Sequence, residues 1–219
     1  MACWRQFRPC VSCPRHVTLV IRRNLINGAK YHHSLDTFLQ YAKQQGLPVN
    51  TTYVVGTVYE YVVLDSLIKS ARMSLEHSGG TGDKGVDLRG TMSTCESEKK
   101  IPVIVQCKYE QKKPGARLFR ELEGSLANSS PETLAVLAAP LSATAAGKRI
   151  LTSSDKAMAF CLVLGYEEGG VMTQMIWNSA ADKLLGGLRV ARVYREVKAE
   201  GEAMTVQSIA LIDTKLSAC

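Results

Sequence analysis

The sequence predicts an α/β fold in which helices flank a central mixed β-sheet. Short apolar runs, typical of buried strands, alternate along the chain with segments whose apolar residues recur at helical spacing. Of the 219 residues, 46% are hydrophobic and 21% are charged, the composition of a chain with a globular core. The apolar runs stay well short of the about 20 residues that a membrane helix requires, so we expect no integral membrane segment.

The N-terminal segment differs in charge from the rest of the chain. The formal charge is +7, yet residues 1–35 hold six basic residues and no acidic one, which leaves +1 for residues 36–219. An Arg-rich, acid-free N-terminus is typical of a mitochondrial transit peptide, and a basic tail that contacts phosphates is the alternative. We therefore predict a leader over residues 1–33, a helix and linker over 34–51 and a folded domain over 52–219, located in the mitochondrial matrix.

Two helices are predicted after the leader. Ser34 is the expected N-cap of a helix that runs to about Gln45 and is terminated by a Gly-Leu-Pro sequence. A second helix is expected from about Thr52 to Met73. Glu60 falls at the centre of its apolar arc, where a carboxylate must be paired, protonated or bound to a cation. The alternative is that Glu60 contacts an N-terminal amide of its own helix.

Further along the chain, apolar runs bounded by turn residues predict strands, and helical periodicity predicts helices. The predicted strands are residues 75–78, 86–89, 101–108, 133–139, 157–164, 189–197 and 204–213. The predicted helices are residues 116–127, 143–151 and 178–185. Trp177, just before the last of these helices, is expected in the core rather than as a platform for a nucleic-acid base.

The seven cysteines are expected to be reduced. Cys107 and Cys161 fall inside predicted strands as small core residues. Cys10 and Cys13 form a lone CxxC pair without the second pair of a zinc site.

A glycine-rich connection over residues 79–85 joins the first two predicted strands. It lacks the GKS/T sequence of a P-loop, so we expect no phosphate site of that kind. Asp87 opens the strand that follows. Asp83, enclosed by glycines, is expected to be a turn residue and is the competing aspartate. Taken alone, both aspartates are compatible with an ordinary hairpin.

The predicted strand 101–108 ends in polar side chains. Gln106 and Lys108 share one face, so an amide and an ammonium emerge side by side, while Cys107 lies on the other face. Taken alone, this pattern is also compatible with a strand that simply runs out into solvent at Lys108.

The three polar features together resemble the motif of the PD-(D/E)xK nuclease superfamily: a carboxylate on a helix, an aspartate that opens a strand, and Gln-x-Lys about 20 residues later. The Gly-Val-Asp and Gln-x-Lys sequences are similar to its Mrr-type branch. The segments GDKGVDLRG, IPVIVQCKYEQKK and RELEGSL are similar to the fungal mitochondrial "required for respiratory growth" family, which carries this domain. The likeness covers roughly residues 52–188 and implies a restriction-endonuclease-like core.

The resemblance implies metal-dependent hydrolysis of phosphodiester bonds. It places Mg²⁺, for which Mn²⁺ can substitute, on Asp87, Gln106 and the Cys107 backbone carbonyl, with Glu60 completing the site. Lys108 would orient the attacking water or stabilise charge at phosphorus. Gln106 stands where Glu is more widespread in the superfamily, and the missing negative charge predicts a weaker metal affinity.

Nucleic acid is the implied partner, DNA ahead of RNA, in maintenance of the mitochondrial genome. The basic residues expected to follow a phosphate backbone are Lys112, Lys113, Arg117 and Arg120, with Lys148, Arg149 and Lys156 as a weaker patch. A solvated helix face paired with glutamates is the alternative. Many relatives act as dimers, so a homodimer is compatible with the resemblance. Competing functions are a catalytically weak nucleic-acid-binding module, an RNA-directed mitochondrial nuclease and an assembly scaffold for respiratory proteins.

Overall fold

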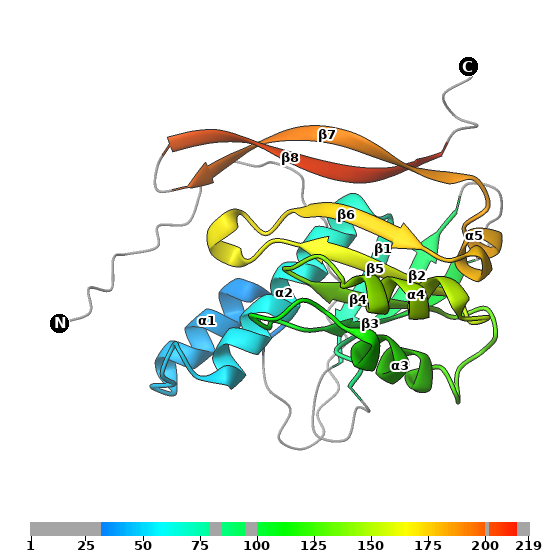
Figure 1. The fold of residues 1–219 in the computed structure, drawn as a ribbon. Helices are drawn as coiled ribbons and strands as arrows, with labels where there is room; N and C mark the ends of the chain where they lie inside the picture. Colours follow the sequence, from blue (N-terminus) through cyan, green and yellow to red (C-terminus); the bar gives the residue numbers. More distant parts are fainter. Residues whose placement is uncertain (1–31, 79–84, 95–99, 200–201, 214–219) are drawn as a thin grey trace. The chain divides into compact units, whose positions relative to one another are not determined.

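A six-stranded β-sheet forms the centre of the fold in a computed structural model of the chain, which describes residues 32–78, 85–94, 100–199 and 202–213 (Figure 1). The strands are β1 (Met73–His77), β2 (Leu88–Ser93), β3 (Lys100–Cys107), β4 (Leu134–Ala139), β5 (Met158–Val163) and β6 (Met172–Trp177). They lie in the sheet in their chain order. The β3–β4 and β4–β5 pairs are parallel and the other pairs antiparallel, which confirms the predicted mixed sheet.

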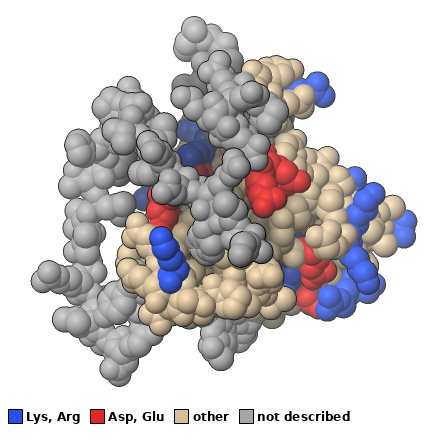
Figure 2. All heavy atoms as spheres, turned by 90° about the vertical axis from the view of Figure 1, so that its left-hand side faces the viewer, with Lys and Arg blue, Asp and Glu red and all other residues tan. Residues whose placement is uncertain are grey.

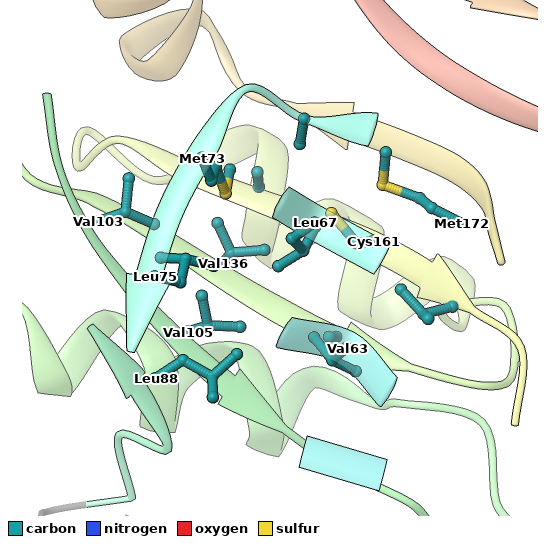
Figure 3. Close-up of a cluster of buried hydrophobic side chains, with 14 of the residues drawn as sticks. Val63, Leu67, Met73, Leu75, Leu88, Val103, Val105, Val136, Cys161 and Met172 are labelled. Atoms are coloured by element: carbon teal, nitrogen blue, oxygen red, sulfur yellow. The ribbon is translucent and has the colours of Figure 1, made fainter. Parts of the chain in front are cut away.

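Helices cover both faces of this sheet. They are α1 (Leu35–Gln44), α2 (Thr52–Ser70), α3 (Ala116–Ser125), α4 (Ala145–Ser153) and α5 (Ser179–Leu185), with a 3₁₀ turn, η1, at Tyr166–Glu168. On one face, Val63 and Leu67 of α2 lie over Val105, Val136 and Cys161 of the sheet (Figure 3). On the other face, α3 and α4 pack on the alternate residues of the same strands. Within the described residues, no helix is both long and apolar enough to cross a membrane.

The helix starts follow from local capping. Ser34 is the N-cap of α1, as predicted: its side chain accepts a hydrogen bond from the Thr37 backbone N–H. The Thr37 side chain in turn accepts from the Ser34 backbone N–H, which completes a capping box. At the starts of α2 and α4, the side chains of Thr51 and Thr144 each accept a hydrogen bond from the backbone N–H three residues further on. Asn178 caps α5 and also accepts from the Met158 backbone, which ties this helix to β5.

The second helix differs from its prediction in length and in burial. It ends at Ser70 instead of Met73, because Arg72 adopts a left-handed backbone conformation (φ 56°) and Met73 opens β1. Ser66 and Ser70, which helical spacing places outside the apolar arc centred on Glu60, are buried. The cause is that α2 contacts α1, β1, β6 and β8, so it is covered on more than one side.

The strands near the C-terminus differ in part from their predictions. Strand β6 was not predicted, and Trp177 is the last residue of that strand instead of the start of a helix. Trp177 still packs against the core, as expected, and its indole N–H donates to Asp182. The two C-terminal strands are confirmed: β7 (Leu188–Ala199) and β8 (Glu202–Asp213) pair antiparallel as a separate two-stranded sheet. The side chains of Ile209 and Leu211 join this hairpin to the α2 side of the core.

Residues 1–31 of the predicted leader, Asp83 and the cysteines other than Cys107 and Cys161 lie outside the described residues. The predicted leader boundary at residue 33 is too late, because His32 is buried in the folded domain and its carbonyl accepts a hydrogen bond from Tyr61. The two described cysteines are free thiols, as predicted.

Candidate active site

Strand β3 carries the Gln-x-Lys sequence into the middle of the sheet. It pairs with β2 on one side and β4 on the other, and Gln106 lies opposite Leu137. The Lys108 backbone N–H donates to the Ala138 carbonyl (2.9 Å), so the strand pairing continues one residue past Cys107. Lys108 is half-buried. The strand therefore does not simply run out into solvent at Lys108.

Asp87 is fixed against the end of β3 by its backbone and its side chain. It lies one residue before β2, and its N–H donates to the Val105 carbonyl (2.9 Å). Its carboxylate oxygen Oδ2 accepts a hydrogen bond from the Cys107 backbone N–H (2.6 Å). The Asp87 carbonyl accepts from the Ser78 N–H (2.8 Å), which links this residue to the end of β1. A charged acceptor shortens and strengthens such a bond, so the carboxylate has a defined place.

Gln106 is buried beside the end of the glycine-rich connection. Its side chain is 6% exposed. A Cβ atom on Gly85 would lie 3.0 Å from the Gln106 amide nitrogen, while the amide oxygen lies beyond 4 Å from that position. Gly85 also has a positive φ of 76°. Glycine is therefore required at this position both for its conformation and for the room that Gln106 occupies.

Glu60 lies in the interior of α2, and its partner is a histidine of β1. The Glu60 oxygen Oε2 is 2.6 Å from His77 Nε2, and the two side chains are 20% and 16% exposed, respectively. The position of Glu60 in the sequence implied a partner for this carboxylate, and that partner is His77 instead of an N-terminal amide of the helix. His77 was not among the residues singled out from the sequence.

The charges of three predicted site residues affect the pKa of the Cys107 thiol. Burial raises the pKa of that thiol well above its usual value, the carboxylates of Asp87 and then Glu60 raise it further, and Lys108 lowers it. The structure thus places Asp87, Cys107 and Lys108 together at the end of β3. Glu60 lies on the face of the sheet that α2 covers, toward which Cys107 also points, whereas Gln106 points to the opposite face with Ile104.

The oxygen donors of this region suit a hard divalent cation. At the end of β3 they are the carboxylate of Asp87 and the carbonyl of Cys107, which lies on the same edge of β3 as the N–H that bonds to Asp87. The Glu60 carboxylate lies on the α2 face of the sheet and the Gln106 amide on the opposite face. In the parts of the chain that the structure describes, no three His, Cys, Asp or Glu side chains form a metal-holding group. A cation here would therefore rely on amide and main-chain oxygens as well as on carboxylates.

The basic residues predicted to bind a phosphate backbone are all exposed, in the segment after β3 and on α3: Lys112, Lys113, Arg117 and Arg120. Arg117 donates to Glu121 one turn along the helix (2.9 Å), so for this residue the glutamate pairing is observed. In the weaker patch, Lys156 donates to the Glu123 carbonyl. In Figure 2, many of the basic groups in view gather toward the right-hand side, and acidic groups lie among them.

Comparisons with known proteins find a family and a mitochondrial relative. The family described as Required for respiratory growth protein 7 matches residues 51–98 and 91–194. The chain is 34% identical over 167 residues to an uncharacterized mitochondrial protein of Schizosaccharomyces pombe, an alignment that covers 75% of this chain and 66% of that protein. No solved structure matches. The mitochondrial relative confirms the mitochondrial location predicted from the N-terminal charge, without specifying the compartment.

Proposed function

The chain belongs to the Required for respiratory growth protein 7 family of mitochondrial proteins, and on this basis we propose that it is a metal-dependent nuclease of the PD-(D/E)xK type. The proposal includes a restriction-endonuclease-like core, a place in the mitochondrial matrix and mitochondrial DNA as the substrate. The mixed sheet with helices on both faces is compatible with that core.

One observation carries the proposal. The Asp87 carboxylate is held 2.6 Å from the backbone nitrogen of Cys107, the residue between Gln106 and Lys108. The hydrogen bond places a carboxylate, an amide and an ammonium group at the end of one strand. Hydrolysis of a phosphodiester needs this combination of anionic ligands and a nearby cation, because negative charge develops on the phosphoryl oxygens in the transition state.

The residues of the site have distinct expected tasks. Asp87, Gln106, the Cys107 carbonyl and Glu60 would hold Mg²⁺ or Mn²⁺. A cation of this kind polarises a phosphoryl oxygen and lowers the pKa of a bound water. Lys108 would orient the attacking water, whose oxygen bonds to phosphorus as the bond to the leaving sugar oxygen breaks. Because Lys108 is half-buried, solvent screens its charge less than that of an exposed lysine.

The exposed basic residues near the site would guide the phosphate backbone. Lys112 and Lys113 follow Lys108 closely in the chain, and Arg120 lies on the next helix, α3. Arg117 is engaged with Glu121 and is expected to contribute less. Exposed contacts of this type give affinity that depends on salt and carries little sequence preference.

The test is cleavage by the full chain of linear duplex, circular single-stranded and branched DNA and of structured RNA. Each substrate is incubated with Mg²⁺, Mn²⁺ or EDTA. Asp87→Asn and Lys108→Ala are each expected to lower the rate about 100-fold or more. The matched controls are Asp65→Asn and Lys69→Ala, which disrupt an exposed ion pair on α2 whose side chains are 64% and 58% exposed.

The outcomes separate the competing functions. Metal-dependent cleavage of DNA that is lost in both site variants and kept in both controls supports the proposal. Preferential cleavage of RNA would replace the substrate class but keep the chemistry. If no substrate is cut, and DNA binding is the same with EDTA and in Asp87→Asn, the protein is a binding module and the catalytic proposal is wrong.

A further inference from the structure

His77 is a polar side chain beside the candidate active site for which the proposed chemistry gives no task. It is the last residue of β1, and its imidazole is 16% exposed. Its Nε2 atom lies 2.6 Å from Oε2 of Glu60. With an ionised carboxylate as acceptor, the imidazole N–H must be the donor, so the hydrogen bond runs from His77 to Glu60.

The imidazole ring of His77 is itself held in place. The ring of Tyr61 stacks on it, with centroids 4.9 Å apart and an angle of 16° between the planes. Tyr61 is 1% exposed, and its hydroxyl donates to the His32 carbonyl (2.8 Å). The His32 and His77 rings pack edge to face, with centroids 6.1 Å apart and 64° between their planes. His77 is therefore a fixed donor rather than a mobile surface side chain.

A fixed donor restricts the carboxylate that it binds. Glu60 has three side-chain torsions, and a free glutamate on a helix samples several rotamers. Anchoring Oε2 to a rigid imidazole selects among them and holds the negative charge where it acts on the Cys107 thiol. Groups that orient a metal ligand in this way commonly change metal affinity or activity about 10–100-fold when they are removed.

We propose that His77 is a positioning residue, which holds the Glu60 carboxylate in the orientation that the active site requires. This inference rests on the proposed function, because it assigns Glu60 a task at the metal. His77 has no direct role in the chemistry and acts through Glu60 alone.

Two substitutions separate the hydrogen bond from the ring. His77→Phe keeps an aromatic ring for stacking on Tyr61 but removes the donor. His77→Gln removes the ring but places an amide donor near the position of Nε2. Mn²⁺ affinity, measured by calorimetry, and the cleavage rate are expected to fall about 10–100-fold in His77→Phe and to stay within about 3-fold of the wild type in His77→Gln. His33→Phe, at an exposed histidine next to α1, is the matched control and should change neither value.

A double-mutant cycle tests whether His77 acts through Glu60. In a Glu60→Gln background, His77→Phe should change Mn²⁺ affinity and cleavage by less than about 2-fold, because the carboxylate that it orients is gone. A merely structural histidine would lower both values equally in the two backgrounds. Thermal unfolding of each variant confirms that it is folded.

The results distinguish failure of this inference from failure of the proposed function. If the wild type binds Mn²⁺ and cleaves nucleic acid while His77→Phe matches it in both assays, His77 has no positioning role and the nuclease proposal stands. His77 likewise has no positioning role if His77→Phe is impaired equally with and without Glu60. If the wild type neither binds Mn²⁺ nor cleaves any substrate, the proposed function is wrong, and the positioning role of His77 is wrong as well.

Discussion

Replacing Gln106 by glutamate tests how strongly the site depends on a cation. The two side chains have nearly the same shape, so Gln106→Glu changes charge with little change in volume. Gln106 is 6% exposed, and the Asp87 carboxylate is held by the backbone of the next residue, Cys107. Without a cation, an ionised carboxylate at this position is desolvated and repelled by a like charge.

The size of the effect has an upper limit set by protonation. A carboxyl with an unperturbed pKa of about 4.3 can take up a proton at pH 7 at a cost of about 3.7 kcal/mol, and the protonated form again resembles glutamine. We therefore expect the metal-free variant to lose about 2–3.7 kcal/mol of unfolding free energy at pH 7. For a domain of this size, that loss lowers Tm by about 4–15 °C.

The pH dependence has a definite sign. Burial raises the pKa of the new carboxyl in the folded state, so the unfolded state loses its proton first as pH rises. The loss of stability is therefore absent below about pH 4, grows above the unfolded pKa by up to about 1.4 kcal/mol per pH unit, and levels off above the folded pKa.

The assay is thermal and urea unfolding of the variant between about pH 4 and pH 8, with EDTA and with excess Mg²⁺. Mg²⁺ should restore most of the lost Tm at pH 7, because the added carboxylate becomes a ligand. Gln40→Glu, at an exposed position of α1, is the control and should shift Tm by less than about 2 °C. An unchanged Tm in EDTA at pH 7 would refute the electrostatic reasoning, and a lowered Tm that Mg²⁺ does not restore would refute the cation site.

Three further predictions concern the rest of the fold. Burial, assisted by the Glu60 charge, raises the pKa of Tyr61 to about 12. The protonated Tyr61 hydroxyl therefore contributes fully to stability below about pH 10, and this contribution is lost as pH rises to about 12. In urea unfolding, the Tyr61→Phe variant should lose stability less steeply than the wild type over that range. Gly147→Ala should cost about 1–2 kcal/mol in the same assay, because the added methyl would lie 2.6 Å from a ring carbon of buried Phe119. Burial raises the pKa of the Cys161 thiol to about 12, so peptide mapping should find Cys161 unreactive to iodoacetamide at pH 8 in the native protein and alkylated in urea.

The parts of the fold that the sequence predicts well are those with a local cause. The N-terminal boundary of α1 follows from the Ser34 cap, and β3, β4 and β5 follow from apolar runs between turn residues. Strand β6 was missed because its polar and apolar residues do not alternate: Thr173 and Gln174 are adjacent and both half-buried. Ser66 is buried because several elements surround α2, and the periodicity of one helix does not predict how many elements will pack around it.

The candidate site also has a part that the sequence predicts and a part that only the structure shows. The polar residues in apolar surroundings, Glu60 and Gln106, were visible in the sequence, since a buried charge or amide requires a partner. The need for a partner of Glu60 was therefore predictable, but its identity was not. His77 is found only from the pairing of β1 with β2 and the packing of α2 on β1, which bring residues 17 positions apart into contact.

The order of strands in the central sheet has a consequence for how the protein folds. Each strand from β2 to β6 is hydrogen-bonded to the strand that precedes it in the chain. During synthesis from the N-terminus, the pairing partner of each new strand has therefore already been synthesised. Loop closure then costs little entropy at each step, which favours rapid folding. Because Glu60, His77, Asp87 and Lys108 all precede β4, a growing chain holds these residues of the candidate site before β4 has appeared.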